Sequence, residues 1–406
     1  MGVKPMIRSN ICLNACPEGC EKAVRDQIGY VKKMFGGRAT GGPRLALVIG
    51  CSTGYGLASR IAAGFGYGAA TVGISFEKAP TESRVGTPGY YNNAEYDKNA
   101  AAEGLASVTL DGDAFSDEMK ERAVAAVKEA AARANIKPEI DLVIYSLASP
   151  VRTDPKTRVM HKSVIKPIGQ KYAGRTFDLV SGAINEVAVN PASDEEIANT
   201  VKVMGGEDWE LWIDALEAAG VLSPRARTVA YTYIGPRLSW AIYKNGTIGR
   251  AKEDLERAGK AINKQWAGTD KAAWVSVNKA VVTRASAVIP IIPLYIGCLF
   301  KVMKAKGLHE GCIEQIVRLY RDRLYTEEAA ADPHKVAVDS ENRIRIDDWE
   351  MREDVQAETE VLLAGITAEN ITTQADIAGF RHDFLEAHGF DVAGVDEQPV
   401  VAGAGV

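Results

Sequence analysis

Short apolar runs alternate with helical segments along the first 150 residues. The runs occupy residues 44–50, 71–76, 106–110 and 141–145, and the helical segments occupy residues 57–65 and 117–134. Apolar runs this short are typical of strands that a parallel sheet buries on both faces. Strand and helix in regular alternation predict a Rossmann-type, doubly wound parallel α/β sheet.

The second half of the chain is less regular. Residues 228–233 and 274–277 can extend the same sheet, and residues 342–346 alternate as a strand with one solvent-exposed face does. The expected strands are residues 228–233, 274–277 and 342–346, and the expected helices are residues 209–222 and 246–264. Gly205 and Gly206 separate two helical stretches. Because the chain has no Pro/Ser-rich linker, repeat or low-complexity block, we expect one elaborated unit over residues 1–406.

Composition and charge narrow the class of protein. Of the 406 residues, 46% are hydrophobic and 25% are charged, as in ordinary globular proteins. The net charge of −5 argues against nucleic acid as a main partner, although a local basic patch would still accept a phosphate-bearing ligand.

The longest apolar run lies between Arg284 and Lys301 and is interrupted by Pro290 and Pro293. It is shorter than the ~20 residues that span a bilayer, so we expect a buried helix and no membrane span. The amino terminus lacks the apolar core of a secretory signal peptide, which favours a cytoplasmic protein.

Six cysteines raise the question of a metal site. Cys12, Cys16 and Cys20 follow one another at even four-residue steps, a spacing that matches no ligand pattern, and the five histidines lie far away in the sequence. We therefore expect reduced, structural thiols of a cytoplasmic protein and no metal.

A glycine loop follows the first apolar run. Gly50, Gly54 and Gly56 stand between strand and helix, where glycine lets the backbone approach a pyrophosphate beside the helix amino terminus. Glu77 closes the second strand 21 positions after Gly56 and can bind ribose hydroxyls while repelling a 2′-phosphate. The pattern favours dinucleotide binding, and NADH over NADPH, although Lys78 could accept a phosphate; a sharp turn without a ligand is the alternative interpretation.

A tyrosine beside a lysine would supply acid catalysis to a nicotinamide enzyme, because a nearby ammonium stabilises tyrosinate. The four-residue spacing of short-chain dehydrogenases is not found in a suitable place, but Tyr243 and Lys252 are separated by eight residues. On one continuous helix, nine steps of about 100° would place them on opposite faces. Asn245-Gly246-Thr247 predicts a break, with Thr247 as N-cap, which would let the two side chains converge.

With these residues, the chain resembles the trans-2-enoyl-CoA reductases and the related FabV-type enoyl-ACP reductases, whose hallmark is a Tyr-x8-Lys motif. The resemblance extends from Ile11 to Phe384. The matching stretches are residues 50–57, 112–117, 145–150, 204–209, 243–249, 279–293 and 309–315. It implies a Rossmann enzyme, usually monomeric, that uses NADH to reduce the trans-2 double bond of an acyl thioester carried by CoA or by acyl carrier protein.

The resemblance also implies roles for individual residues. Tyr243 would be the proton donor, Lys252 would hold the cofactor and tune the tyrosine, and Tyr233 would touch the acyl substrate. The implied cofactor-binding residues are Gly50, Cys51, Ser52, Thr53, Gly54 and Tyr55 at the pyrophosphate, Phe76 and Glu77 at the ribose-selecting strand end, Asp113 and Ala114 at the adenine, Leu147 and Ala148 near the nicotinamide ribose, and Val281, Val282 and Thr283 at the carboxamide. The apolar stretch after Arg284 would help to wall the acyl pocket.

Two stretches depart from the family pattern. The family usually has His-Pro-x-Gly-Cys near its start, whereas residues 16–20 are Cys-Pro-Glu-Gly-Cys. An arginine and a proline usually follow the glutamate directly, whereas Lys78-Ala79-Pro80 follow Glu77 here. The first departure accounts for the triple cysteine without a metal, and the second weakens the NADH preference only slightly.

These expectations divide the chain into a dinucleotide-binding core at residues 41–150 and a second part at residues 151–406. The second part would complete the sheet, carry Tyr243 and Lys252, and cover the substrate. The alternatives are an atypical short-chain dehydrogenase that acts on a ketone or alcohol, a flavin-dependent reductase, and a non-catalytic NAD-binding module.

Overall fold

The computed structural model describes residues 4–8, 10–179, 181–283, 286, 289 and 291–395. Arg284, which precedes the long apolar run, and Pro290, which interrupts it, lie outside the described residues.

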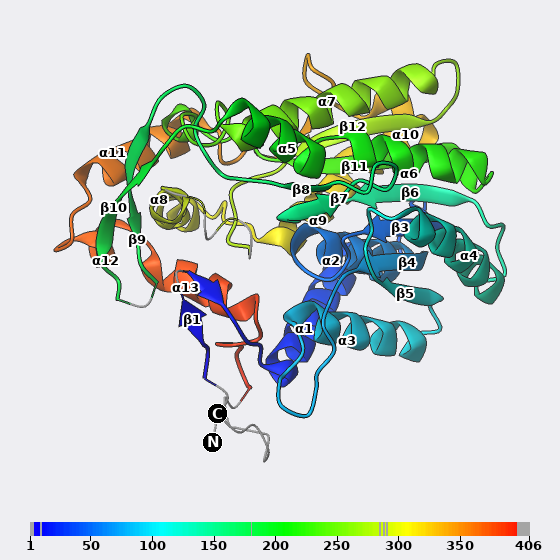
Figure 1. Ribbon diagram of the computed structural model, residues 1–406. Helices are drawn as coiled ribbons and strands as arrows, with labels where there is room; N and C mark the ends of the chain where they lie inside the picture. The colour runs from blue at the N-terminus through cyan, green and yellow to red at the C-terminus, as the bar shows by residue number, and fades with distance from the viewer. Residues whose placement is uncertain are drawn as a thin grey trace.

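A parallel sheet of seven strands forms the centre of the molecule (Figure 1). In spatial order the strands are β13 (Arg343–Arg345), β12 (Ala272–Val277), β11 (Leu222–Thr232), β6 (Ile140–Tyr145), β3 (Leu45–Ile49), β4 (Ala70–Ser75) and β5 (Ser107–Asp111). Neighbouring strands are parallel throughout. The predicted Rossmann-type fold is confirmed, and strands from both halves of the chain share the one sheet.

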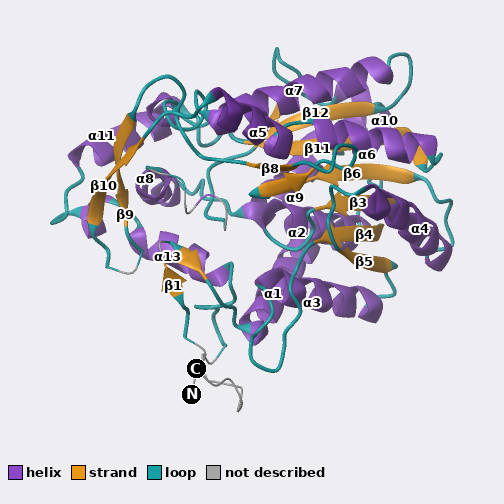
Figure 2. Ribbon diagram, in the orientation of Figure 1, coloured by secondary structure: helices purple, strands orange, loops and turns teal. Residues whose placement is uncertain are grey.

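Alternate residues of each central strand enter opposite cores. Ala46 and Val48 of β3 pack into one core, whereas Leu45, Leu47 and Ile49 pack into the other. The first core is covered by α1 (Pro17–Phe35), α2 (Gly54–Ile61), α3 (Pro88–Ala102) and α9 (Cys312–Leu319), and the second by α4 (Asp117–Arg133), α6 (Glu207–Ala218) and α7 (Thr247–Gln265). Helices on both faces (Figure 2) explain why β3 is a continuous apolar run instead of an alternating one.

A third core lies to one side of the sheet (Figure 1). It is built from α8 (Ile292–Ala305), α11 (Glu353–Gly365), α12 (Ile371–Gln374), α13 (Ile377–Glu386) and the antiparallel hairpin of β9 (Tyr172–Phe177) and β10 (Ile184–Val189). Phe177 of the hairpin meets Phe380 of α13 edge to face, with ring centroids 5.1 Å apart. This core places α8 beside the ends of the central strands.

Helix α8 is the buried helix that the long apolar run predicts. Its side chains from Ile292 to Met303 are buried except that of Lys301. Pro293 lies in the first turn, where a proline removes no helical hydrogen bond. Among the described residues, no helix combines the length and the apolar character that crossing a membrane requires.

Shorter elements connect these layers. They are β1 (Ile7–Arg8), β2 (Ile11–Cys12), β7 (Val151–Thr153), β8 (Met160–Lys162), α5 (Asp194–Met204), α10 (Glu327–Ala331), π-helical turns at Ala62–Gly66 and Tyr320–Leu324, and 3₁₀ turns at Arg237–Ser239 and Pro333–Lys335. The pairs β1–β2 and β7–β8 are antiparallel hairpins.

Two predicted boundaries are wrong. Helix α6 ends at Ala218 and β11 already begins at Leu222, because Gly220 with φ of +64° turns the chain. The N-cap of α7 is Gly246, not Thr247. The Thr247 hydroxyl is used elsewhere, since it donates to the Val164 carbonyl at 2.5 Å and accepts from the Lys166 N–H at 3.2 Å.

Candidate active site

The glycine loop joins β3 to α2 and is too tight for side chains at two positions. A Cβ on Gly50, where φ is +87°, would lie 2.2 Å from the Ser146 carbonyl oxygen. A Cβ on Gly56 would lie 1.8 Å from the Gly50 carbonyl oxygen. Thr53 precedes α2 without capping it through its side chain, so the first N–H groups of the helix stay available. This loop fits the pyrophosphate of a dinucleotide.

Glu77 meets this loop from the end of β4. The Ser52 hydroxyl donates to Glu77 Oε1 at 2.6 Å, and the Glu77 backbone N–H donates to Asp111 Oδ1 at 2.7 Å. The Phe76 side chain is 77% exposed at the same strand end. A carboxylate beside the loop and an exposed ring next to it suit the ribose and base of an adenosine.

The point where the chain order reverses lies between β3 and β6. From β3 the chain continues through β4 and β5 on one side, and from β6 through β11, β12 and β13 on the other. Ligands of such sheets bind at this point, outside the carboxyl ends of the strands. Leu147 and Ala148 directly follow β6, and a Cβ on Gly50 would lie 3.3 Å from the Leu147 side chain.

Asp113 and Ala114 follow β5 at the outer end of the same row of strand ends. Asp113 Oδ1 accepts the Phe115 N–H at 3.0 Å, and the Ala114 carbonyl accepts the Trp212 indole N–H at 3.2 Å. These bonds fix the backbone of the turn, so its place beside the predicted adenosine region is set by the fold.

The segment Val281-Val282-Thr283 follows β12 and crosses back to the glycine loop. A Cβ on Gly54 would lie 3.9 Å from Thr283 Cγ2, and the Tyr55 hydroxyl donates to the Lys279 carbonyl at 2.9 Å. Val281 and Val282 are buried. The structure thus brings this predicted segment to the amino terminus of α2, across the point where the chain order reverses.

Lys252 lies in the second turn of α7 and Tyr243 precedes that helix, on the other side of a turn. The Tyr243 carbonyl accepts the N–H groups of Gly246 and Gly249, each at 3.1 Å, which reverses the chain before the helix begins. The Lys252 ammonium donates to the Tyr231 carbonyl at 3.1 Å, and burial lowers the pKa of Lys252 to about 8. Lys252 is therefore anchored at the end of β11.

Tyr243 is at the same strand end. Its ring meets that of Tyr233 edge to face, with centroids 5.1 Å apart, and only 8% of Tyr243 is exposed. Among the described residues, the Tyr243 hydroxyl has no hydrogen-bond partner. Burial raises the pKa of Tyr243, so the phenol is protonated at neutral pH and can donate a hydrogen bond. The tuning of this pKa by Lys252 stays a prediction.

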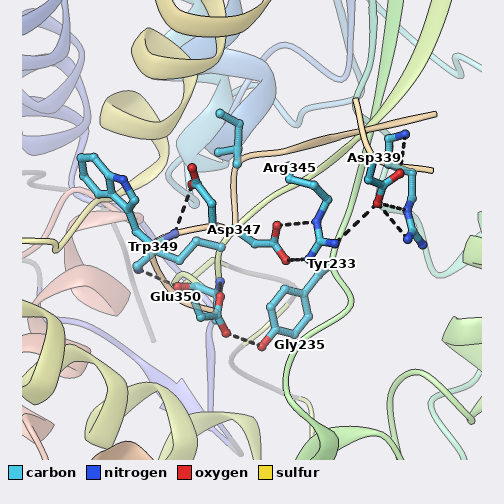
Figure 3. Close-up of polar contacts among 12 residues, drawn as sticks. Tyr233, Gly235, Asp339, Arg345, Asp347, Trp349 and Glu350 are labelled. Carbon is cyan, nitrogen blue, oxygen red and sulfur yellow. Dashed lines mark hydrogen bonds and ion pairs between the residues drawn. The ribbon is translucent and has the colours of Figure 1, made fainter. Parts of the chain in front are cut away.

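The Tyr233 hydroxyl is hydrogen-bonded to the buried carboxylate of Glu350 (Figure 3). Its hydroxyl donates to Glu350 Oε1 at 3.0 Å, and the Tyr295 hydroxyl of α8 donates to the same oxygen at 2.6 Å. Glu350 lies shortly after β13, near an ion-pair network in which Arg345 binds Asp339 and the buried Asp347 (Figure 3).

Glu350 and Tyr295 are not predicted from the sequence. Glu350 is 117 residues from its partner Tyr233, so no local spacing connects them. One signal was available: an acidic residue shortly after the predicted strand at residues 342–346 must lie near the carboxyl edge of a parallel sheet.

The cysteine segment serves the packing of α1. Cys16 precedes the helix, and its N–H donates to the His388 carbonyl at 2.9 Å. A Cβ on Gly19 would lie 1.7 Å from the Gly389 carbonyl oxygen, so residues 388–389 press against the first turn. All six cysteines are thiols, and the described residues contain no His, Cys, Asp or Glu group arranged for a metal ion.

Three family models match the chain. Residues 84–325 match the "trans-2-enoyl-CoA reductase catalytic region", and residues 2–82 match the "NAD(P)H binding domain of trans-2-enoyl-CoA reductase". Residues 338–400 match a model described as "enoyl reductase FAD binding domain".

The described part of that third segment, residues 338–395, does not fit a flavin. It forms β13, α11, α12 and α13, whose buried residues pack into the cores around β12 and α8. Its glycines lie at helix ends or in a first helical turn, or they contact α1 as Gly389 does. None of them lies in a strand–loop–helix segment of the kind that binds a pyrophosphate. We therefore assign no step to a flavin.

Individual relatives match over almost the whole chain. The trans-2-enoyl-CoA reductase [NADH] of Treponema denticola is 56% identical over 404 residues, which cover 99% of this chain and 98% of the relative. The enoyl-[acyl-carrier-protein] reductase [NADH] of Flavobacterium johnsoniae is 51% identical, covering 98% of this chain and 96% of the relative. The crystal structure of the Treponema denticola enzyme in complex with NAD superposes with a TM-score of 0.91 at 55% identity, covering 99% of this chain and 98% of that one. With its glycine loop, its strand order and its Tyr243–Lys252 segment in place, the chain belongs to the trans-2-enoyl-CoA reductase family.

Proposed function

We propose that this chain is an NADH-dependent reductase that saturates the trans-2 double bond of an enoyl thioester. The observation that carries the proposal is the placement of Tyr243. The residue is buried, its protonated hydroxyl has no partner among the described residues, and it lies at the strand end where Lys252 is anchored. A donor left unsatisfied in a buried site is expected to meet a substrate acceptor.

The residues that would hold NADH are those gathered along the carboxyl ends of the strands. Gly50, Gly54 and the first turn of α2 would bind the pyrophosphate, with Cys51, Ser52, Thr53 and Tyr55 completing the loop. Glu77 would bind the adenosine ribose, beside Phe76, Asp113 and Ala114. Leu147, Ala148 and the segment Val281-Val282-Thr283 would enclose the nicotinamide end.

Tyr243 is the general acid in this mechanism. A bound reduced nicotinamide would supply the hydride that Cβ of the enoyl thioester accepts. As negative charge moves to the thioester oxygen, the Tyr243 hydroxyl stabilises it by a hydrogen bond or by proton transfer. The Lys252 ammonium binds the ribose hydroxyls and keeps a positive charge near this oxygen. Protonation of the resulting enolate at Cα completes the saturated acyl thioester.

The substrate is an acyl thioester on CoA or on acyl carrier protein, which share the phosphopantetheine arm. We place the enzyme in the cytoplasm as a monomer that acts as one elaborated unit over residues 1–406, with its dinucleotide-binding core at residues 41–150, and with no nucleic-acid partner. The apolar wall of the acyl pocket is assigned to α8, whose residues pack next to Tyr233 in the third core.

A substrate panel tests the proposal against carbonyl reduction. NADH oxidation is followed with crotonyl-CoA, with acetoacetyl-CoA and with a simple ketone, and products are identified by mass spectrometry. Turnover of crotonyl-CoA to butyryl-CoA, with none for the two carbonyl substrates, supports enoyl reduction. Turnover of a carbonyl substrate alone would make the chain an atypical short-chain dehydrogenase. NADH binding without turnover of these substrates or of an enoyl-acyl carrier protein would make it a binding module.

A further inference from the structure

A fully buried carboxylate joins three parts of the site. Glu350 is 0% exposed and accepts the Tyr233 hydroxyl and the Tyr295 hydroxyl on Oε1, at 3.0 and 2.6 Å. Its Oε2 accepts the Ala280 N–H at 2.7 Å, directly before the segment Val281-Val282-Thr283. Glu350 therefore connects the end of β11, helix α8 and the predicted nicotinamide segment. Its contact with Tyr233 is shown in Figure 3.

The hydrogen-bond partners fix where the protons lie. The Gln356 amide N–H₂ donates to the Tyr295 oxygen at 3.1 Å, so the proton of Tyr295 is directed to Glu350. The Ala280 N–H donates to Glu350 Oε2, so this oxygen also acts as an acceptor. Burial raises the pKa of Glu350, whereas the donors on both of its oxygens and the nearby charge of the buried Lys279 favour the ionised form.

An ionised Glu350 fixes the direction in which the Tyr233 hydroxyl proton points. Its one hydroxyl proton points away from the acyl site, toward Glu350, so that only oxygen lone pairs face Tyr243 and the substrate. The neighbouring Tyr243 hydroxyl has no such partner among the described residues and keeps its proton for the site. The two tyrosines thus present opposite hydrogen-bonding characters: Tyr243 donates and Tyr233 accepts.

We propose that Glu350 is a positioning residue that makes Tyr233 an acceptor for an amide N–H of the thioester's carrier arm. This inference rests on the proposed function. The thioester oxygen and the double bond offer no donor, but the pantetheine arm that both carriers share has an amide N–H two carbons from the sulfur. Tyr233 would recognise that N–H, while Tyr243 serves the thioester oxygen.

Two small substrates test this directly. S-crotonyl-N-acetylcysteamine carries the amide N–H, and S-butyl thiocrotonate does not. In the wild type we expect kcat/KM to favour the amide-bearing ester, and we expect Tyr233→Phe to lower that preference about fivefold to tenfold, the worth of one hydrogen bond. With crotonyl-CoA, the same variant should raise KM by a similar factor with little change in kcat.

Glu350→Gln keeps the size of the side chain but replaces one acceptor oxygen by an N–H₂ donor. With its oxygen bound to the Ala280 N–H, its amide donates toward Tyr233, which turns the tyrosine proton into the site and removes the acceptor. We expect this variant to lose the preference for the amide-bearing ester as Tyr233→Phe does. Tyr295→Phe is the matched control, because it removes another partner of Glu350 and should leave the preference unchanged.

The outcomes separate the two proposals. If the wild type reduces neither crotonyl-CoA nor an enoyl thioester of acyl carrier protein, the proposed function fails. If it reduces crotonyl-CoA and both small esters with no preference, or if Tyr233→Phe keeps the preference, the role of Tyr233 is overturned while the function stands. Should Glu350→Gln lower kcat/KM equally for both esters, Glu350 is only structural. Thermal melting of each variant confirms that it is folded.

Discussion

The rings of Tyr233 and Tyr243 meet edge to face with centroids 5.1 Å apart, yet their hydroxyls are placed differently. The Tyr233 hydroxyl donates to a buried glutamate, whereas that of Tyr243 meets no hydrogen-bond partner among the described residues. Glu350, which is far from both tyrosines in the sequence, thus distinguishes the hydroxyls of two neighbouring phenols. In the proposed mechanism, the acid is Tyr243, the tyrosine whose hydroxyl has no partner among the described residues.

The pKa of Lys252 predicts how NADH binding depends on pH. Burial lowers this pKa to about 8, so the ammonium form dominates at pH 7 and is lost as the pH rises through 8. If the ammonium holds the ribose hydroxyls, the Kd for NADH should rise about tenfold between pH 7 and pH 9. Fluorescence titration of NADH at pH 7, 8 and 9 measures this change.

Lys252→Arg is the control for this pH dependence. A guanidinium keeps its charge over the whole range, so the Kd of that variant should stay flat up to pH 9. An equal rise in both proteins would assign the pH dependence to another group.

The carboxylate of Glu77 should set the preference for NADH. Glu77→Gln removes the charge that would repel a 2′-phosphate but can still accept the Ser52 hydroxyl. We expect kcat/KM for NADPH to rise about tenfold, as loss of a repulsion of ~1.4 kcal/mol would give. Steady-state rates with both cofactors test this, with Glu82→Gln as a control that changes the net charge equally on an exposed loop. An unchanged NADPH-to-NADH ratio would remove Glu77 from cofactor selection.

The tightness of the glycine loop gives a stability prediction. In Gly56→Ala the new methyl would lie 1.8 Å from the Gly50 carbonyl oxygen, which is backbone and cannot rotate away. We expect a loss of about 1–3 kcal/mol in the free energy of unfolding, together with weaker NADH binding. Thermal melting and NADH titration measure the two effects.

Gly29→Ala is the matched control for this substitution. Gly29 lies within α1 with open space around it, so alanine should stabilise the fold by about 0.5–1 kcal/mol. If Gly56→Ala melts like Gly29→Ala and binds NADH normally, the loop is not the tight cradle described above.

Much of the sheet is predictable from the sequence because of where its strands lie. Strands β3, β4 and β6 are covered on both faces, so they are short, largely apolar runs in the sequence. The hairpin of β9 and β10 was not predicted. Its strands pair only with each other and are half exposed, which leaves no continuous apolar run to detect.

The candidate site likewise contains residues that local sequence patterns predict and residues that meet only in the folded chain. The glycine loop and Glu77 are local patterns at strand ends, and the break before α7 follows from residues 245–247 alone. The resemblance supplied the roles of Tyr243 and Lys252, because eight intervening residues do not by themselves show convergence. Glu350 and Tyr295 reach Tyr233 only through the folding of α8 and β13 around it, so no sequence spacing reports them.

Replacement of Tyr243 by phenylalanine, with crotonyl-CoA turnover followed by NADH oxidation at 340 nm, tests the central claim most directly. The hydroxyl has no protein partner among the described residues, so Tyr243→Phe should fold, melt and bind NADH as the wild type does. Loss of the acid should lower kcat by roughly 10²–10⁴-fold. A variant that binds NADH normally and keeps the wild-type kcat would show that Tyr243 does not stabilise the thioester oxygen, and would contradict the account.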